Sequence, residues 1–322
     1  MPMSIAFENR LYPLLEEIVA HFGTPFHIYD EAGIRETGYR LKRCFCGIPG
    51  FREYYAVKAL PNPAILAIMA DMGFGFDCSS VAELVLSRRA GGSGEALMFT
   101  SNNTTRQEFA MAMADGCSIV NLDDISLVDK LPAIPDLICF RYNPGERRSG
   151  NAIIGTPVEA KYGVSHERLI EAYRTARDRG VKRFGLHTML ASNERDHTYM
   201  VQTAAMLLEQ VDRISTALDI RFAFINIGGG LGIPYFPKDR ALDLNAIAEP
   251  AEAAIQKLKE SFCDPEVIME LGRFLVGEAG VYVCRVIDIK ESRGIRYAIT
   301  DGGLHHHLAA SGNFGQVIRK NY

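Results

Sequence analysis

A surplus of basic residues is missing from this sequence: 35 Lys and Arg stand against 39 Asp and Glu, for a net charge of −4. Such a chain has nothing that draws in a phosphate backbone, so nucleic acid is not an expected partner. Apolar runs of membrane-spanning length are missing too, and the first residues carry acids where a signal peptide needs bases. We therefore expect a cytoplasmic protein that acts on small molecules and has no membrane partner.

Paired cysteines are also missing. The seven cysteines are scattered, mostly within apolar runs, and none forms a CxxC pair. This usage is typical of buried thiols in a reducing compartment. Cys44 and Cys46 could form a redox couple or half of a metal site, although two cysteines on a helix-like stretch more often serve packing.

The chain does contain a regular alternation of short apolar runs and helical patterns, from about residue 51 to 275. With 322 residues and 48% hydrophobic composition, it can bury one large core, with or without a smaller satellite domain. Eight strands alternating with helices predict an α/β fold of the (β/α)8 TIM-barrel type. The eight runs cover residues 54–58, 74–77, 97–100, 118–122, 137–143, 183–187, 222–230 and 267–273.

The pattern changes after Arg273, where alternation continues without helices. This indicates the start of an antiparallel β-sheet domain with a hairpin turning near Arg293 and Gly294. The early run PFHIYD is expected to add a strand to that domain. The expected organisation is an N-terminal segment at 1–31 that contributes to the sheet domain, a barrel at 32–280 and a partial C-terminal β domain at 281–322.

Candidate chemistry lies at the carboxyl ends of the predicted strands, where barrels of this kind build their active sites. Lys58 ends the first strand, and partial desolvation there is expected to depress its pKa and free its amine for imine formation. The alternative is a lysine that caps a strand at the rim. Gly228, Gly229 and Gly230 follow the seventh strand and Arg273 the eighth, which favours a phosphate site over a simple tight turn. An amine beside a phosphate pocket suits an aldehyde phosphate cofactor.

The segment YYAVKALPN resembles the YAVK segment that carries the Schiff-base lysine in fold-type III decarboxylases dependent on pyridoxal phosphate (PLP). This alanine-racemase-like group includes the ornithine, arginine and diaminopimelate decarboxylases. Further segments resemble family motifs in the same chain order: FDCSSVAEL, RYNPG, AKYGV, INIGGGLG and ELGR. The ordered set is far more specific than any one of its members.

The resemblance implies a PLP-dependent carboxy-lyase that forms an internal aldimine on Lys58 and releases CO2 from an amino acid or a carrier-linked amino acid. It also implies a homodimer. Glu270 would hydrogen-bond the pyridine nitrogen and keep the ring an electron sink, and Asp77 would lie near the ring and the lysine. From the residues alone, both acids are more often structural. The remaining cofactor-binding residues implied are Ser192, Gly228, Gly229, Gly230, Gly272 and Arg273, with His187 and Met189 beside the ring.

Two positions depart from the family pattern. Met189 stands where the family motif H-x-G-S has a histidine stacked on the ring; a methionine can cover the ring but cannot donate a proton. His187, two residues earlier, lies on the same strand face at a different depth. Leu271 replaces the proline of the family's EPGR. Both changes suggest an altered substrate.

The segment 305–322 resembles a branch with unusual substrates, which includes the decarboxylase of carrier-tethered glutamyl groups in aminoglycoside synthesis. A metal cluster at His305 to His307 is disfavoured because consecutive strand residues point to opposite faces. The chain stops at Tyr322, before the family's cysteine motif and later tyrosine, so we expect a truncated chain that binds PLP but decarboxylates poorly.

Two other functions remain open from the sequence. A racemase on the same scaffold would need a tyrosine opposite Lys58 in the sheet domain, within the segment beyond Tyr322. A PLP-binding protein without catalysis would need only the barrel, and the sheet-domain start argues against it.

Overall fold

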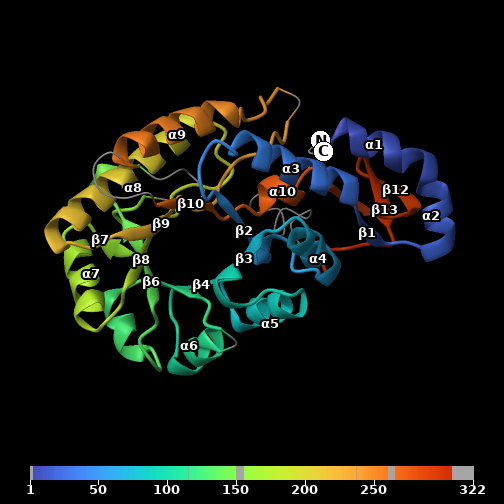
Figure 1. The fold of residues 1–322 in the computed structure, drawn as a ribbon. Helices are drawn as coiled ribbons and strands as arrows, with labels where there is room; N and C mark the ends of the chain where they lie inside the picture. The colour runs from blue at the N-terminus through green and yellow to red at the C-terminus, as the bar shows by residue number, and fades with distance from the viewer. Residues whose placement is uncertain (1–2, 115, 150–155, 237, 260–264, 307–322) are drawn as a thin grey trace. The chain divides into compact units, whose positions relative to one another are not determined.

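The computed structural model describes residues 3–114, 116–149, 156–236, 238–259 and 265–306. The chain divides into two compact units (Figure 1). One unit comprises the residues up to Ile34, Tyr235–Asp239 and the residues from Gly277 onward. The other comprises Arg35–Pro234 and Arg240–Val276, and it carries the candidate site.

The larger unit is a closed parallel barrel, which confirms the predicted (β/α)8 fold. Within the described residues its sheet runs in the order β5-β4-β3-β2-β10-β9-β8-β6-β7, and a further pairing of β5 with β6 closes the ring (Figure 1). The short strand β7 (Val164–Ser165) beside β6 was not predicted. The eight barrel strands are β2 (Arg52–Ala56), β3 (Gly75–Cys78), β4 (Leu97–Ser101), β5 (Ile119–Leu122), β6 (Leu137–Asn143), β8 (Arg183–His187), β9 (Phe222–Asn226) and β10 (Glu266–Met269).

Two barrel helices begin at residues whose side chains cap them. Asn62 precedes Pro63, the first residue of α4 (Pro63–Asp71), and its side chain accepts a hydrogen bond from the Ala64 amide. Ser80 caps the next helix through the Glu83 amide. A 3-10 helix, η4 (Ile125–Lys130), replaces the expected α-helix between β5 and β6. The α-helices of the barrel are α3 (Glu31–Cys44), α4 (Pro63–Asp71), α5 (Val81–Arg89), α6 (Arg106–Met113), α7 (Leu169–Asp178), α8 (His197–Leu218), α9 (Asn245–Lys259) and α10 (Arg273–Val276).

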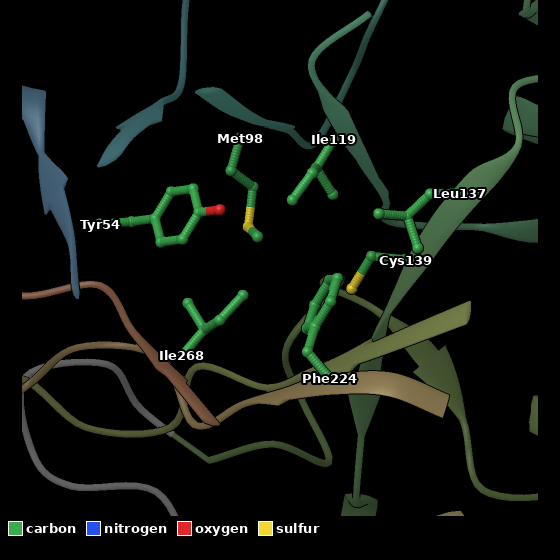
Figure 2. Packing of buried hydrophobic residues seen from close by; sticks show 7 residues of the cluster. All are labelled: Tyr54, Met98, Ile119, Leu137, Cys139, Phe224 and Ile268. Atoms are coloured by element: carbon green, nitrogen blue, oxygen red, sulfur yellow. The ribbon is translucent and has the colours of Figure 1, made fainter. Parts of the chain in front are cut away.

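The barrel interior is filled by side chains from successive strands. Figure 2 shows the cluster, to which the Phe224 ring contributes from β9. Gly185 on β8 faces this ring. A Cβ atom at that position would come within 2.1 Å of the ring, so a residue with a side chain would displace Phe224. The cluster consists of Tyr54, Met98, Ile119, Leu137, Cys139, Phe224 and Ile268.

The smaller unit contains α1 (Ile5–Leu11), α2 (Leu15–Phe22) and antiparallel strands. Strand β1 (Phe26–Tyr29) pairs with β11 (Gly280–Val283). Strands β12 (Val286–Ser292) and β13 (Ile295–Thr300) form the expected hairpin. Its turn residues Arg293 and Gly294 have φ of 52° and 75°, the positive values that a tight hairpin turn requires. Among the helices of the described residues, none combines the length and the apolar character that crossing a bilayer requires.

Replacing Phe224 by Ala should lower the free energy of unfolding by about 3–5 kcal/mol, because it leaves a cavity in the cluster inside the barrel. Phe22 is 74% exposed, and Phe22→Ala should change stability by no more than about 0.5 kcal/mol. Urea unfolding followed by circular dichroism measures both variants. Equal losses would show that the Phe224 cluster does not stabilise the barrel.

Candidate active site

The candidate site is built at the carboxyl ends of β2, β3 and β10. Lys58 lies in the single 3-10 turn that follows β2, and its Nζ is 3.4 Å from Oδ2 of Asp77 on β3. The Asp77 side chain is buried, whereas the Lys58 side chain is 59% exposed. The barrel mouth thus presents a lysine whose side chain is largely exposed and whose amine contacts a buried carboxylate.

The expectation of a depressed Lys58 pKa was wrong. The Asp77 carboxylate raises the pKa of Lys58, and this attraction outweighs the opposing effect of desolvation. Glu270 adds to the rise. The sequence did not show that both acids face the same lysine.

Glu270 follows β10 and is buried between two partners from neighbouring strands. Asn226 at the end of β9 donates from Nδ2 to Oε1 of Glu270 at 2.6 Å. Nε2 of His187, at the end of β8, lies 3.2 Å from Oε2. Burial raises the pKa of Glu270, but His187, Lys58 and Asn226 together outweigh it, so the net pKa is lowered and Glu270 is an ionised carboxylate at neutral pH.

Asp77 has the opposite balance. Burial, followed by the Glu270 charge, raises the pKa of Asp77 to about 7, although Lys58 opposes this. Two neighbouring acids are therefore separated in their ionisation: Glu270 holds a charge and Asp77 titrates near neutrality. Such a separation of two carboxyl groups is typical of acid–base sites.

The predicted glycine loop packs against the backbone of Glu270. Gly228 and Gly230 have φ of 71° and 102°, which side chains disfavour. A Cβ atom on Gly229 would come within 2.1 Å of the Glu270 carbonyl oxygen. The Gly229 amide donates to the sulfur of Met189 at 3.3 Å. Met189 therefore lies directly against the loop.

The remaining predicted residues lie at the same end of the barrel. Half-buried Ser192 follows β8, and exposed Arg273 is the first residue of α10 after β10. Gly272 is next to β2, where a Cβ atom would come within 2.6 Å of the Ala59 Cβ. Their contacts with the phosphate remain a prediction.

Sequence reasoning gave no role to Asn226 and Glu53, which hold the Glu270 segment. Asn226 binds the Glu270 side chain, and Glu53 accepts a hydrogen bond from the Leu271 amide at 2.7 Å. A signal for Glu53 was present, since it is an acid inside the strand REYYA, whose other residues are mostly apolar. Asn226 is a polar residue at the end of an apolar strand directly before the glycine loop.

A small open hollow of about 20 Å3, which is room for about one water molecule, adjoins Met189. Arg141 on β6 lies in its wall, donates to Oδ1 of Asn102 at 3.2 Å and stacks its guanidinium 4.9 Å from the centre of the Tyr162 ring. The hollow is lined by Arg141, Tyr142, Asn143, Pro157, Ala160, Tyr162, Met189 and Leu190.

These residues fit an aldehyde phosphate cofactor with a ring nitrogen. The Lys58 amine suits the aldehyde, and Glu270 is a charged acceptor. The glycine loop has no side chains, although the amides of Gly228 and Gly229 donate to Oδ1 of Asn226 and the sulfur of Met189, so a phosphate would have to replace these partners.

Oδ1 of Asp77 and both ring nitrogens of His187 are buried and make no hydrogen bond of good geometry among the described residues; the 3.2 Å separation of Nε2 from Oε2 of Glu270 is an ion-pair contact. A polar ligand at the mouth of the barrel would bring such groups their partners.

Comparison with known proteins gives one matching family, described as the pyridoxal binding domain of pyridoxal-dependent decarboxylases, over residues 33–277. Protein TabA of Pseudomonas amygdali pv. tabaci is 42% identical, over 96% of this chain and 75% of that protein. Diaminopimelate decarboxylase of Methanothermobacter thermautotrophicus is 34% identical, over 94% and 72%. The L-glutamyl-[BtrI acyl-carrier protein] decarboxylase of Niallia circulans is 29% identical, over 95% and 72%.

Solved structures show the same fold. Diaminopimelate decarboxylase from M. jannaschii, in complex with L-lysine, superposes with a TM-score of 0.85 at 24% identity, over 94% of this chain and 72% of that one. Lysine/ornithine decarboxylase from Vibrio vulnificus, complexed with cadaverine, gives a TM-score of 0.79 at 22% identity, over 97% and 79%.

Replacing Asp77 by Asn should flatten the pH dependence of stability. Folding raises the pKa of Asp77 from 3.8 to about 7, so within this window the folded protein keeps a proton that the unfolded chain has released. Asp77 therefore lowers stability as the pH rises through the window, by at most about 1.4 kcal/mol per pH unit.

Urea unfolding of the cofactor-free protein at stepped pH values, with the wild type measured in parallel, gives the two slopes. The Asp77→Asn variant should lose less stability than the wild type between pH 5 and about 7, the upper end of the titration. Parallel curves for the two proteins would contradict the raised pKa of Asp77.

Proposed function

Because the chain belongs to the pyridoxal-dependent decarboxylase family and is a PLP-dependent carboxy-lyase, we propose that it removes CO2 from an amino acid longer or less basic than ornithine or lysine, free or joined to a carrier. The observation that carries the decarboxylase chemistry is the Lys58 amine, which contacts Asp77 and lies within the electrostatic influence of the ionised Glu270. The proposal includes a homodimer in the cytoplasm, as the family resemblance implies.

The cofactor would be held by residues of the barrel mouth. We assign Lys58 to its aldehyde, Glu270 to its ring nitrogen, and the loop Gly228–Gly230 with Ser192 and Arg273 to its phosphate. Asp77, His187, Met189 and Gly272 complete the proposed shell. When bound, PLP supplies an electron sink for the electron pair left when CO2 departs.

Glu270 serves this chemistry through its fixed charge. Its ionised carboxylate would accept a hydrogen bond from a protonated ring nitrogen and keep the proton there. Asn226 and His187 hold the carboxylate in place from two neighbouring strands. The charge is arranged before the substrate arrives, which is the condition for effective electrostatic catalysis.

Asp77 contacts the amine of Lys58 and affects its protonation. The raised pKa of Lys58 favours its ammonium form, which has no free electron pair for attack. Oδ2 of Asp77 lies 3.4 Å from Nζ and holds the ammonium in place. With a pKa of about 7, Asp77 is a much weaker base than the amine, so the proton of Lys58 must leave to solvent before Nζ can attack.

Met189 and the neighbouring hollow support the substrate proposal. Met189 would give the ring face an apolar cover without a proton donor. The hollow beside it has room for about one water molecule, so it supports the proposal through the character of its wall and not through its size. Arg141 and Tyr162 in its wall suit a polar or acidic extension better than the ammonium of ornithine. The carrier-protein decarboxylase among the relatives acts on a linked glutamyl group. A racemase and a PLP-binding protein without catalysis have no support among the relatives described above.

Lys58 should be the residue that holds the cofactor. Borohydride reduction of the PLP-loaded protein, followed by peptide mapping, should place the cofactor mass on the peptide that contains Lys58. Lys58→Ala should lose the visible absorbance band of the bound cofactor, because Lys58 is the only lysine in β2 and the turn that follows it. Lys290→Ala, on the exposed strand β12, is the control and should keep the band. Persistence of the band in Lys58→Ala would disprove the assignment.

The substrate proposal predicts selectivity against the small basic amino acids. The PLP-loaded protein should release CO2 faster from carrier-linked glutamyl groups, or from other extended acidic amino acids, than from free basic ones. The measurement is CO2 release across a panel of free and carrier-linked amino acids. Robust turnover of free meso-diaminopimelate, ornithine or arginine would refute the proposed substrate class and leave the decarboxylase assignment intact.

A further inference from the structure

Both backbone groups of Leu271 are held by β2, the strand that leads to Lys58. The Leu271 carbonyl accepts a hydrogen bond from the Ala56 amide at 3.0 Å. The Leu271 amide donates to Oε1 of Glu53 at 2.7 Å. Leu271 and Glu53 are both buried, with exposed fractions of 1% and 3%. A buried acid thus replaces the water or backbone acceptor that this amide would otherwise need.

The amide exists because this chain has a leucine in the segment ELGR, where the family pattern EPGR has a proline. Proline has no backbone N–H, so the family pattern needs no acceptor at this point. A buried N–H without a partner destabilises the fold, and Glu53 supplies that partner here. The acid in the strand and the leucine in the turn are therefore complementary.

The turn that carries Leu271 lies between the two halves of the proposed cofactor site. On one side, the Glu270 amide donates to the Gly228 carbonyl at 3.0 Å, which ties the turn to the glycine loop. On the other side, Gly272 packs against Ala56 and Ala59, which flank the Lys58 turn. A shift of Leu271 would move Glu270 relative to both groups.

We infer that Glu53 is a positioning residue that locks the Leu271 amide and thereby fixes the Glu270 carboxylate relative to Lys58. Glu53 acts through Leu271 and touches neither cofactor nor substrate. The inference rests on the proposed role of Glu270 at the ring nitrogen.

The protonation of Glu53 agrees with this role. Burial raises the pKa of Glu53 well above its usual range; the Leu271 amide opposes this, while the Glu270 and Asp77 charges add to it. The neutral acid keeps a carbonyl oxygen for the Leu271 amide and places no third negative charge beside Glu270. Glutamine reproduces this neutral form, so Glu53→Gln is the conservative variant.

The test compares Glu53→Gln, Glu53→Leu, Leu271→Pro and the double variant Glu53→Leu/Leu271→Pro in the whole chain. The first readout is the PLP dissociation constant, titrated through the visible band of the bound cofactor. The second is the thermal midpoint of the cofactor-free protein. Glu171→Leu, on the exposed face of α7, is the surface control and should match the wild type in both.

Glu53→Gln should bind PLP within about threefold of the wild type. Glu53→Leu should bind about tenfold more weakly, the size expected for one buried unpaired amide, with a displaced absorbance maximum. The double variant should bind PLP more tightly than Glu53→Leu, because the proline removes the amide that lost its acceptor.

Wild-type affinity and spectrum in Glu53→Leu would overturn the inference, as would a Glu53→Gln loss equal to that of Glu53→Leu. A lowered thermal midpoint in Glu53→Leu with unchanged PLP affinity and spectrum would show a purely structural role and also overturn it. Glu270→Gln distinguishes a failure of the proposed Glu270 role from a failure of the Glu53 positioning role. If Glu270→Gln leaves the cofactor band and the PLP affinity unchanged, the proposed role of Glu270 is wrong. If Glu270→Gln weakens binding while Glu53→Leu does not, only the positioning role is wrong.

Discussion

The site depends on keeping one buried carboxylate charged at the barrel mouth. Glu270 stays ionised because His187, Lys58 and Asn226 together outweigh its burial. After burial, the Glu270 charge is the next cause that raises the pKa of Asp77, and it adds to the rise that Asp77 causes in the pKa of Lys58. The ionisation of the group is therefore shared among these residues, with Glu270 as the one they have in common. Without them, burial would favour a neutral acid that could not hold a proton on a ring nitrogen.

The backbone enforces the same arrangement. Gly229 must lack a side chain because the Glu270 carbonyl occupies the space, and the Glu270 amide binds the Gly228 carbonyl. The loop proposed for the phosphate and the acid proposed for the ring nitrogen are consequently one packed unit instead of two independent features. A unit of this kind holds a ligand at two points with little loss of entropy on binding.

Strand positions were predictable because barrel strands are buried on both faces and read as short apolar runs. The role proposed for Lys58 came from the family resemblance. Lys58 interrupts such a run at its carboxyl end. The network around it was not predictable, since its members meet only in the closed barrel. Glu53 and Leu271 are 218 residues apart, and Asn226 and Glu270 are 44 apart. The expected low pKa of Lys58 failed for the same reason.

The two departures from the family pattern each come with a compensating contact. Leu271 introduces a buried amide, and Glu53 accepts its hydrogen bond. Met189 removes an imidazole, and its sulfur accepts a hydrogen bond from the Gly229 amide. Each substitution thus comes with a residue that contacts the new group. A substitution without such a residue would leave a buried polar group unpaired or a gap in the packing. The substitution at Met189, with its partner in the loop, therefore supports the proposed change of substrate over a damaged version of the family site.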